Sequence, residues 1–411
     1  MTKLRKAVLA ACGLAMFTIV GGGAHAAEKK PAVEDKALVH ARELLKKVIL
    51  IDGHNDLPWT IRNDKKAPGD VAAYDLNGTV SGQTDLKRIA QGGLGAQFWS
   101  VYIPGETGTG FAKTQLEQID IARRMIAQYP QFAFATTAEE VRAAKREGRL
   151  GSLLGMEGGH AIENSLGALR AYYDLGVRYM TLTHNVNLDW ADSAAKPPQH
   201  GGLTKFGEDV VLEMNRIGML VDLSHVSEGT MDDALRVSKA PVIFSHSSAR
   251  AVCDVPRNVP DSILKRLPEN GGVVMVTFVA GFIDPEIGKI QVPAMMEYSR
   301  LSQGKSPEEA EKIAAEIMGK LKLPKTSIGK VADHIEHIRK VASVKNIGLG
   351  GDYDGNTEWP VGLEDVSGYP LLFAELIRRG WSDEDLTLLA GENVLRALAQ
   401  AENVSRTMNK N

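Results

Sequence analysis

Ionisable side chains follow several apolar segments of this sequence. The segment 48–52, VILID, runs directly into His54 and Asp56, and the segment 151–157 ends in Glu157. Four further segments lead into a histidine or an aspartate: His184 in TLTHN, His225 in VDLSH, His246 in FSHSSAR and Asp352 in GGDYDG. Burying so many ionisable groups at one place is costly unless something compensates their charge. A divalent cation would do so.

Each of these residues taken alone has an ordinary structural explanation. A lone His-x-Asp pair is common, and a glutamate after a strand is more often a helix cap or an ion-pair partner. A lone His184 or His225 would be a packed, hydrogen-bonded histidine, and DYDG alone is typical of a turn. The joint pattern favours a metal site because the same residue types recur at the ends of different segments.

Histidine and carboxylate ligands without cysteine suit zinc in a catalytic site, where coordination positions stay open for water. The candidate ligands outnumber what one zinc ion needs. Two ions would share them, roughly 3.5–4 Å apart, with a carboxylate between the ions. The five candidates are His54, Asp56, Glu157, His225 and His246.

The elements that would position these residues alternate in type along the chain. Helical-period segments at 117–129, 138–147, 206–217 and 331–342 lie between short apolar segments. Eight such repeats predict an α/β fold, a TIM-like (β/α)8 barrel, with a doubly wound open sheet as the alternative. Polar groups at the ends of several strands favour the barrel. The eight predicted strands are 48–52, 96–102, 151–157, 177–183, 218–223, 241–245, 272–278 and 346–351.

Residues 1–26 resemble a secretory signal, with a basic start, an apolar run and AHA ending at Ala26. We expect an exported, periplasmic protein. LAAC at 9–12 offers a lipoprotein anchor on Cys12 as the lesser alternative, and the apolar run is too short for a membrane span. Residues 27–411 are predicted to form one domain, with an irregular insertion at about 284–330 that contains one helix capped by Ser306.

Composition excludes several classes of protein. The chain has 411 residues, of which 44% are hydrophobic and 24% are charged, as in ordinary globular proteins. Loss of the three basic residues of the signal moves the formal net charge from −3 to −6, so nothing indicates a nucleic-acid partner. Cys253 is the only cysteine after the signal, which excludes an intramolecular disulfide and a cysteine-based zinc site.

Sequence motifs between about residues 40 and 400 resemble the membrane dipeptidase, or renal dipeptidase, family of zinc peptidases. They occur in the family's order: DGHNDLPW, GAQFWSVY, EGGH, YMTLTHN, FSHSSA, RNVP, GGDYDG and GLEDVSGYP. The resemblance implies a barrel of the metal-dependent hydrolase type, dipeptide substrates and two zinc ions per subunit. It also implies a homodimer as a possible assembly. Animal members carry disulfides and a C-terminal lipid anchor, for which this sequence shows no signal.

The same resemblance assigns roles to the candidate ligands. His54 and Asp56 match ligands of one zinc ion, and Glu157 matches the bridging carboxylate. His225 and His246 match ligands of the second ion. These are the five residues that the strand ends indicate without the family.

Three further residues match substrate-handling positions of the family. His184 would contact the scissile carbonyl, and Arg257 in RNVP would pair with the terminal carboxylate, for which a planar guanidinium is suited. Periodicity alone makes Arg257 a solvated loop charge. Asp352 would carry a proton from the attacking water to the leaving amine. Asp354 is its competitor, although Asp354-Gly355 is typical of a turn.

The sequence therefore predicts a zinc-dependent dipeptidase. The alternatives are a related metal-dependent hydrolase, such as a lactonase, an N-acyl amino acid deacylase or a phosphoesterase, and a non-catalytic exported protein that binds metal or dipeptide. HIEH at 334–337 has metal-like spacing but is expected on a solvated helix face. Cys253 is expected to be a buried thiol.

Overall fold

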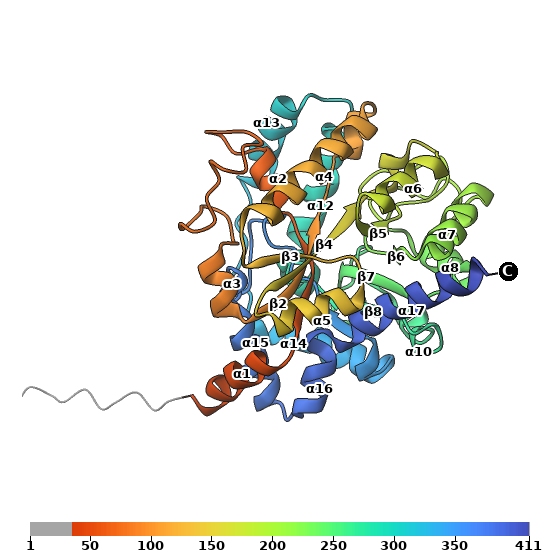
Figure 1. Ribbon diagram of the computed structural model, residues 1–411. Helices are drawn as coiled ribbons and strands as arrows, with labels where there is room; N and C mark the ends of the chain where they lie inside the picture. Colours follow the sequence, from red (N-terminus) through yellow and green to blue (C-terminus); the bar gives the residue numbers. More distant parts are fainter. Residues whose placement is uncertain (1–34, 411) are drawn as a thin grey trace, which may run out of the picture. The chain divides into compact units, whose positions relative to one another are not determined.

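Eight parallel strands close into a barrel in the computed structural model, which describes residues 35–410 (Figure 1). The order around the ring is β2-β1-β9-β8-β7-β6-β5-β4, and the pairing of β2 with β4 closes it. This confirms the predicted (β/α)8 barrel and excludes the open sheet. The strands are β1 Leu50–Asn55, β2 Leu94–Ser100, β4 Leu150–Glu157, β5 Val177–Thr181, β6 Leu220–Asp222, β7 Val242–Ser247, β8 Val273–Val276 and β9 Ile347–Leu349.

All eight predicted segments overlap a barrel strand, and one strand was not predicted. The additional strand, β3 Phe132–Phe134, pairs with the first residues of β4. Three residues are too few to show a periodicity, which is why β3 could not be predicted from the sequence. The barrel strands read as apolar runs because parallel strands in a barrel are buried on both faces.

One glycine in β4 makes room for a side chain that the site uses. A Cβ atom added to Gly155 would lie 2.0 Å from the ring of Tyr179 in β5. Only glycine leaves that space, so the Tyr179 ring can fill the barrel interior beneath the ends of the strands. Tyr179 is fully buried, and its hydroxyl lies 2.8 Å from the ring of His54.

Helices surround the barrel (Figure 1). Several begin at the residue types that satisfy free backbone N–H groups, and Thr137 forms a capping box with Glu140 at the start of α5. The longer helices are α1 Lys36–Lys47, α4 Phe111–Gln128, α5 Ala138–Arg146, α6 Leu166–Asp174, α7 Lys205–Ile217, α8 Glu228–Val237, α14 Ile328–Val341, α15 Tyr369–Arg378 and α17 Asn393–Met408. The shorter helices are α2 Leu57–Arg62, α3 Leu86–Gly92, α9 Asp261–Leu264, α10 Leu267–Asn270, α11 Ala280–Ile283 and α16 Asp383–Thr387.

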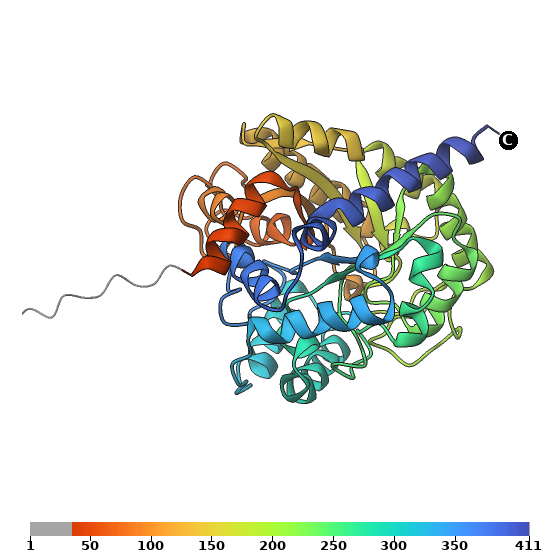
Figure 2. The same ribbon diagram turned by 90° about the horizontal axis from the view of Figure 1, so that it is seen from below.

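One end of the barrel is covered by α17, which Figure 2 shows in dark blue across the face toward the viewer. Val394, Leu398 and Ala401 of this helix share a buried cluster with residues at the starts of strands, such as Leu220 and Val273. The amino ends of the strands are therefore closed by apolar packing. The polar residues lie at the opposite end, where the strands finish.

The predicted insertion at 284–330 is more regular than expected. It contains two helices, α12 Pro285–Leu301 and α13 Pro307–Met318, where the sequence predicted an irregular stretch with one helix. The Ser306 hydroxyl accepts a hydrogen bond from Glu309 N at 3.3 Å, which confirms the predicted cap of α13. Pro293 lies inside α12. Because proline disfavours the interior of a helix, the sequence did not predict α12.

The expectation of a solvated HIEH face is wrong for His334. Its side chain is fully buried in α14, where Nδ1 accepts from Ala249 N at 3.0 Å and Nε2 donates to Ile283 O at 3.1 Å. His337 is partly buried and lies 2.7 Å from Asp261. His334 thus satisfies two backbone groups of neighbouring loops.

The predicted signal at 1–26 and its alternative anchor at Cys12 lie outside the described residues. Within residues 35–410, none of the helices has the length and apolarity that crossing a bilayer would require.

Candidate metal centre

The predicted ligands converge at the carboxyl ends of the barrel strands. Three groups of side chains each bring their ligand atoms within 4.8 Å of one another. Glu157 belongs to two of these groups, and so does His54, which makes the three groups one continuous cluster. The groups are His54, Glu157 and His246; Glu157, His184 and His225; and His54, Asp56 and Asp352.

Glu157, at the end of β4, faces histidines with both of its carboxylate oxygens. Oε1 lies 2.9 Å from Nε2 of His225 and 3.2 Å from Nε2 of His246. Oε2 lies 3.5 Å from Nε2 of His54. Ligand atoms of a tetrahedral zinc ion, each about 2.1 Å from the metal, stand about 3.4 Å apart. The spacing around Glu157 is therefore that of a coordination shell.

Two buried polar atoms beside Glu157 have no hydrogen-bond partner among residues 35–410. They are Nε2 of His54 and Oδ1 of Asp56. Oδ2 of Asp56 lies 3.3 Å from the same histidine nitrogen. Unsatisfied polar atoms in a protein interior require an explanation, and a bound cation supplies one here. The residues present fit a metal ion at this position.

The protonation state of His54 follows from its neighbours. The Tyr179 hydroxyl donates to Gly53 O at 3.1 Å, so it can only accept from the histidine. Nδ1 of His54, 2.8 Å away, therefore carries the ring proton. In the neutral ring the lone pair is then on Nε2, which is the nitrogen that faces Glu157 and Asp56. Burial opposes protonation of this ring, but the charges of its neighbours outweigh that effect and raise the pKa of His54 well above its usual value, so a cation would compete with a proton for Nε2.

His225 and His246 are oriented in the same way. Nδ1 of His246 lies 2.8 Å from the Ser245 hydroxyl, which donates to Asp222 Oδ2 at 2.6 Å and so accepts from the ring. Nδ1 of His225 donates to Asn185 Oδ1 at 3.2 Å. Burial lowers the pKa of both histidines well below its usual value, so both rings are neutral. Neutral imidazole is the form that binds metal.

Asp222, at the end of β6, is a buried carboxylate that the sequence analysis missed. Oδ1 accepts from the backbone N–H groups of Ser224 at 3.1 Å and Ser245 at 2.7 Å. Oδ2 accepts from the hydroxyls of Ser245 at 2.6 Å and Thr181 at 2.5 Å. Burial raises the pKa of Asp222, and these hydrogen bonds oppose that rise. Its position three residues before His225 is the one signal that the sequence offers.

Asp52, inside β1, plays a comparable part for the first group of ligands. Oδ1 accepts from His54 N at 2.9 Å and from Gln97 Nε2 at 2.8 Å. Oδ2 accepts from Gly351 N at 2.6 Å and from the Tyr369 hydroxyl. Asp52 thereby joins the backbone of His54 to that of the loop that carries Asp352. In the sequence Asp52 is marked only as the end of an apolar run.

Arg257 is buried at this end of the barrel, with an exposed fraction of 7%. Its guanidinium donates to Ser247 Oγ and to His246 O, both at 3.3 Å, and it lies over the Phe282 ring. Nε has no hydrogen-bond partner within residues 35–410. Burial lowers the pKa of Arg257 to about 10. The solvated loop charge that periodicity suggested is therefore wrong.

His184 follows β5 and belongs to the group that also contains Glu157 and His225. Its ring centroid is 4.3 Å from that of His225 and 4.9 Å from that of Tyr102. Nδ1 of His184 is buried and has no hydrogen-bond partner in the part of the chain that the structure describes. The ring is thus available to a ligand at the cluster.

Asp352 and its sequence competitor Asp354 point to different surroundings. Oδ1 of Asp352 lies 4.0 Å from Nε2 of His54, and burial raises its pKa well above the usual value. Oδ1 of Asp354 accepts from Gln83 N at 2.9 Å, on a neighbouring loop. Only Asp352 belongs to a ligand group.

Backbone conformation is unusual at two of these positions. His225 and Asp352 have φ values of 65° and 67°, in the left-handed region that residues with a Cβ seldom adopt. Such conformations cost of order 1–3 kcal/mol each and concentrate at functional sites. Both residues turn their side chains into the cluster at that cost.

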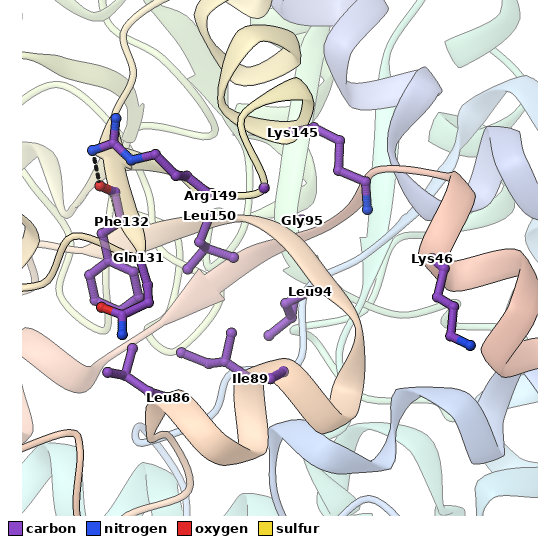
Figure 3. Close-up of a pocket in the computed structure, with 12 residues that line it drawn as sticks. Lys46, Leu86, Ile89, Leu94, Gly95, Gln131, Phe132, Lys145, Arg149 and Leu150 are labelled. Atoms are coloured by element: carbon purple, nitrogen blue, oxygen red, sulfur yellow. Dashed lines mark hydrogen bonds between the residues drawn. The ribbon is translucent and has the colours of Figure 1, made fainter.

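A separate cavity of about 330 Å³ lies near the amino ends of β2 and β4 (Figure 3). Its walls combine apolar side chains, such as Leu86 and Ile89, with Lys46, Lys145 and Arg149. Arg149 donates to Phe132 O, and Lys46 pairs with Glu43. This cavity lies at the opposite end of the strands from the metal-ligating cluster.

A closed (β/α)8 barrel with histidines and carboxylates gathered at its carboxyl end defines a metal-dependent hydrolase. The model of the membrane dipeptidase family, peptidase family M19, matches residues 38–411, and the chain belongs to that family. It is a metallo-dipeptidase.

Relatives and solved structures agree with this assignment. Dipeptidase 3 of Rattus norvegicus is 42% identical over 380 residues, which cover 91% of this chain and 68% of the rat protein. Dipeptidase 3 of Mus musculus is 41% identical with the same coverage. The structure of dipeptidase AC, a metallopeptidase of family M19, is 25% identical, with a TM-score of 0.70 over 86% of this chain and 98% of that one.

A metallopeptidase of Rhodobacter sphaeroides, solved with a phosphinate mimic of the dipeptide L-Ala-D-Ala, shares the fold. It is 24% identical, with a TM-score of 0.70 over 86% of this chain and 99% of that one.

Proposed function

We propose that this chain hydrolyses the amide bond of dipeptides that have a free C-terminal carboxylate, with two zinc ions per subunit. The observation that carries the proposal is the position of Glu157, whose Oε1 faces His225 and His246 and whose Oε2 faces His54. His54 and Asp56 would hold one ion and His225 and His246 the other, with Glu157 between them. Nitrogen and oxygen ligands without sulfur suit zinc at a catalytic site.

When bound, the two ions would polarise the scissile carbonyl and make water a nucleophile at neutral pH. The protein supplies a carboxylate for the proton of that water. Asp352 would accept this proton as the oxygen bonds to the carbonyl carbon, and would deliver it to the amide nitrogen as the C–N bond breaks. The products are two amino acids, and Asp352 returns to its starting state.

Arg257 and His184 would orient the substrate. The buried guanidinium of Arg257, with its free Nε, would pair with the terminal carboxylate one residue beyond the scissile bond. His184, beside the second group of ligands, would donate to the carbonyl oxygen as negative charge develops there. Together they favour dipeptides over longer peptides, whose carboxylate lies further away.

Metal analysis combined with a substrate panel tests this proposal. We expect two zinc ions per chain, hydrolysis of dipeptides, loss of activity after chelation and recovery on adding zinc. Lactones, phosphate esters and N-acyl amino acids should be poor substrates. A protein that cleaves these compounds and leaves dipeptides intact, or that binds dipeptides without turnover, contradicts it.

We also propose export to the periplasm with cleavage after Ala26, and a homodimer as the assembly. N-terminal sequencing of the protein from the periplasmic fraction should begin at Ala27. A lipid-modified Cys12 would contradict this cleavage. Light scattering of the purified protein should give the mass of two chains, whereas one chain's mass would contradict the dimer.

A further inference from the structure

Glu106 is a buried carboxylate that the proposed mechanism does not use. It lies in the short helix η1, Gly105–Thr107, which follows β2, and its exposed fraction is 8%. No basic side chain among residues 35–410 forms an ion pair with it. A buried carboxylate without a cation is costly, so a positively charged ligand would stabilise it.

Tyr102 connects Glu106 to the metal-ligating cluster. Its ring centroid lies 4.9 Å from that of His184 and 5.0 Å from that of Trp59. Burial raises the pKa of Tyr102 well above its usual value, and the charges of Glu106 and Glu157 raise it further. The Tyr102 hydroxyl is thus within electrostatic reach of both carboxylates.

Glu106 and Arg257 lie on opposite sides of the barrel mouth. Glu106 follows β2, and Arg257 follows β7, which is four strands away in either direction around the closed ring of eight. The metal-ligating residues lie between these two sides. A dipeptide spans at most about 7 Å when extended, and its two charged ends point in opposite directions. With the carboxylate at Arg257, the ammonium end is directed toward β2.

The inserted segment contributes to the same side of the mouth. Gly304, in the turn between α12 and α13, donates its N–H to Glu106 O at 2.7 Å. Tyr298, near the end of α12, is partly buried. Burial raises the pKa of Tyr298, and the charge of Glu106 raises it further. The 284–330 insertion therefore contacts the Glu106 backbone through Gly304 and carries a second tyrosine that the charge of Glu106 reaches.

We propose that Glu106, with the hydroxyls of Tyr102 and Tyr298, binds the α-ammonium group of the substrate. This inference rests on the proposed dipeptidase function and deepens it. Glu106 is a specificity-determining residue, because an N-acyl amino acid also presents a carboxylate to Arg257 but offers no cation to Glu106. The chain thereby selects compounds with both a free amino end and a free carboxyl end.

A matched pair of substrates tests the subsite. Alanyl-alanine and its desamino analogue, N-propionyl-alanine, differ only in the ammonium group. Glu106→Gln should lower kcat/KM for alanyl-alanine by about 10- to 100-fold, as loss of a charged hydrogen bond does, and leave the desamino analogue within about twofold. Tyr298→Phe should lower kcat/KM for the dipeptide about fivefold. Glu297→Gln, at an exposed neighbouring position on α12, is the control and should match the parent.

Two further measurements separate the alternatives. The zinc content and circular dichroism of Glu106→Gln should equal those of the parent, which excludes loss of the metal centre or of the fold as the cause. If the ratio of kcat/KM for the two substrates is the same in Glu106→Gln as in the parent, the proposed ammonium subsite is wrong. The dipeptidase proposal is unaffected by that result. A parent protein that cleaves no dipeptide overturns the proposed function itself.

Discussion

The Nε2 atoms of His225 and His246 lie 2.9 Å apart, and both face Oε1 of Glu157. Each ring holds its proton on Nδ1, so two lone pairs and a carboxylate oxygen point at one another. These groups repel unless a cation lies between them. The folded protein without metal is therefore less stable than the protein with metal.

Zinc should raise the thermal stability of the protein from which a chelator has removed the metal. Binding to the folded state alone increases the free energy of unfolding with ligand concentration, by about 2.7 kcal/mol at a hundred times Kd. Differential scanning calorimetry of the metal-free protein across a zinc titration measures the effect. His225→Ala should reduce the zinc-dependent rise in Tm, whereas the exposed control His40→Ala should retain it. A Tm that is independent of zinc would contradict the metal site.

Asp222→Asn should weaken zinc binding at one of the two proposed positions by about 10- to 100-fold. This is the usual effect of removing a hydrogen-bond partner that orients a metal ligand. Asp222 holds the Ser245 hydroxyl that fixes the ring of His246. Titration against a competing chelator measures both affinities. Asp232→Asn, on the exposed face of α8, is the control. Two unchanged affinities in Asp222→Asn would remove the positioning role of Asp222.

Arg257→Ala should abolish the preference for a free carboxylate. We expect kcat/KM for dipeptides to fall about 100-fold, because charged hydrogen bonds to the carboxylate are lost, while that for dipeptide amides stays nearly constant. Arg236→Ala, on the surface of α8, serves as the control. A variant at Arg257 that still prefers dipeptides to their amides rules out the assigned role.

Asp352→Asn should lower kcat by about 10²- to 10⁴-fold, the range of a general acid–base contribution. Its zinc content should equal that of the parent, because an amide oxygen occupies the place of the carboxylate oxygen. Turnover equal to that of the parent would exclude proton transfer by Asp352. Lost zinc would instead identify Asp352 as a ligand.

His334 should make stability depend on pH. Burial lowers its pKa to about 4, below the usual value of about 6.5 in an unfolded chain. As the pH falls below about 6.5 the unfolded chain takes up a proton that the folded protein does not. The stability contributed by neutral His334 is therefore present above that pH and is lost progressively down to pH 4.

Lowering the pH from 7.5 to 5 should reduce the free energy of unfolding by about 2 kcal/mol through His334. Urea titrations at the two pH values measure it. His334→Gln should be less stable at pH 7.5 but should show a pH dependence that is smaller by this amount. The exposed variant His40→Gln should behave as the parent. Equal pH dependence in His334→Gln and the parent would refute the assignment.

The sequence predicted the barrel because its strands are buried on both faces and so read as apolar runs. The same pattern located His54, Glu157 and His246, since each follows such a run within a few residues. It did not locate β3, whose three residues have no measurable period. It also missed the helical character of α12, where Pro293 interrupts the pattern.

The remaining functional residues depend on contacts between distant segments. Asp222 and Asp52 are strand residues whose importance lies in hydrogen bonds to Ser245 and to Gly351. His334 was expected on a solvated face because periodicity does not show which loops pack over a helix. Glu106 stands in the short helix η1, whose three residues show no pattern in the sequence, and its contact with Gly304 joins segments that are far apart in the chain.

The left-handed backbone at His225 and Asp352 has a consequence for laboratory selection experiments. Glycine at position 352 would relieve the strain and make the protein more resistant to heat, but it would remove a group that the chemistry needs. Glycine at position 225 would relieve similar strain and would also lose the stability that zinc adds through His225. Laboratory selection for thermal tolerance alone should therefore accumulate glycine at position 352 and yield inert barrels. A screen that also demands turnover would keep both residues and find its stabilising changes elsewhere.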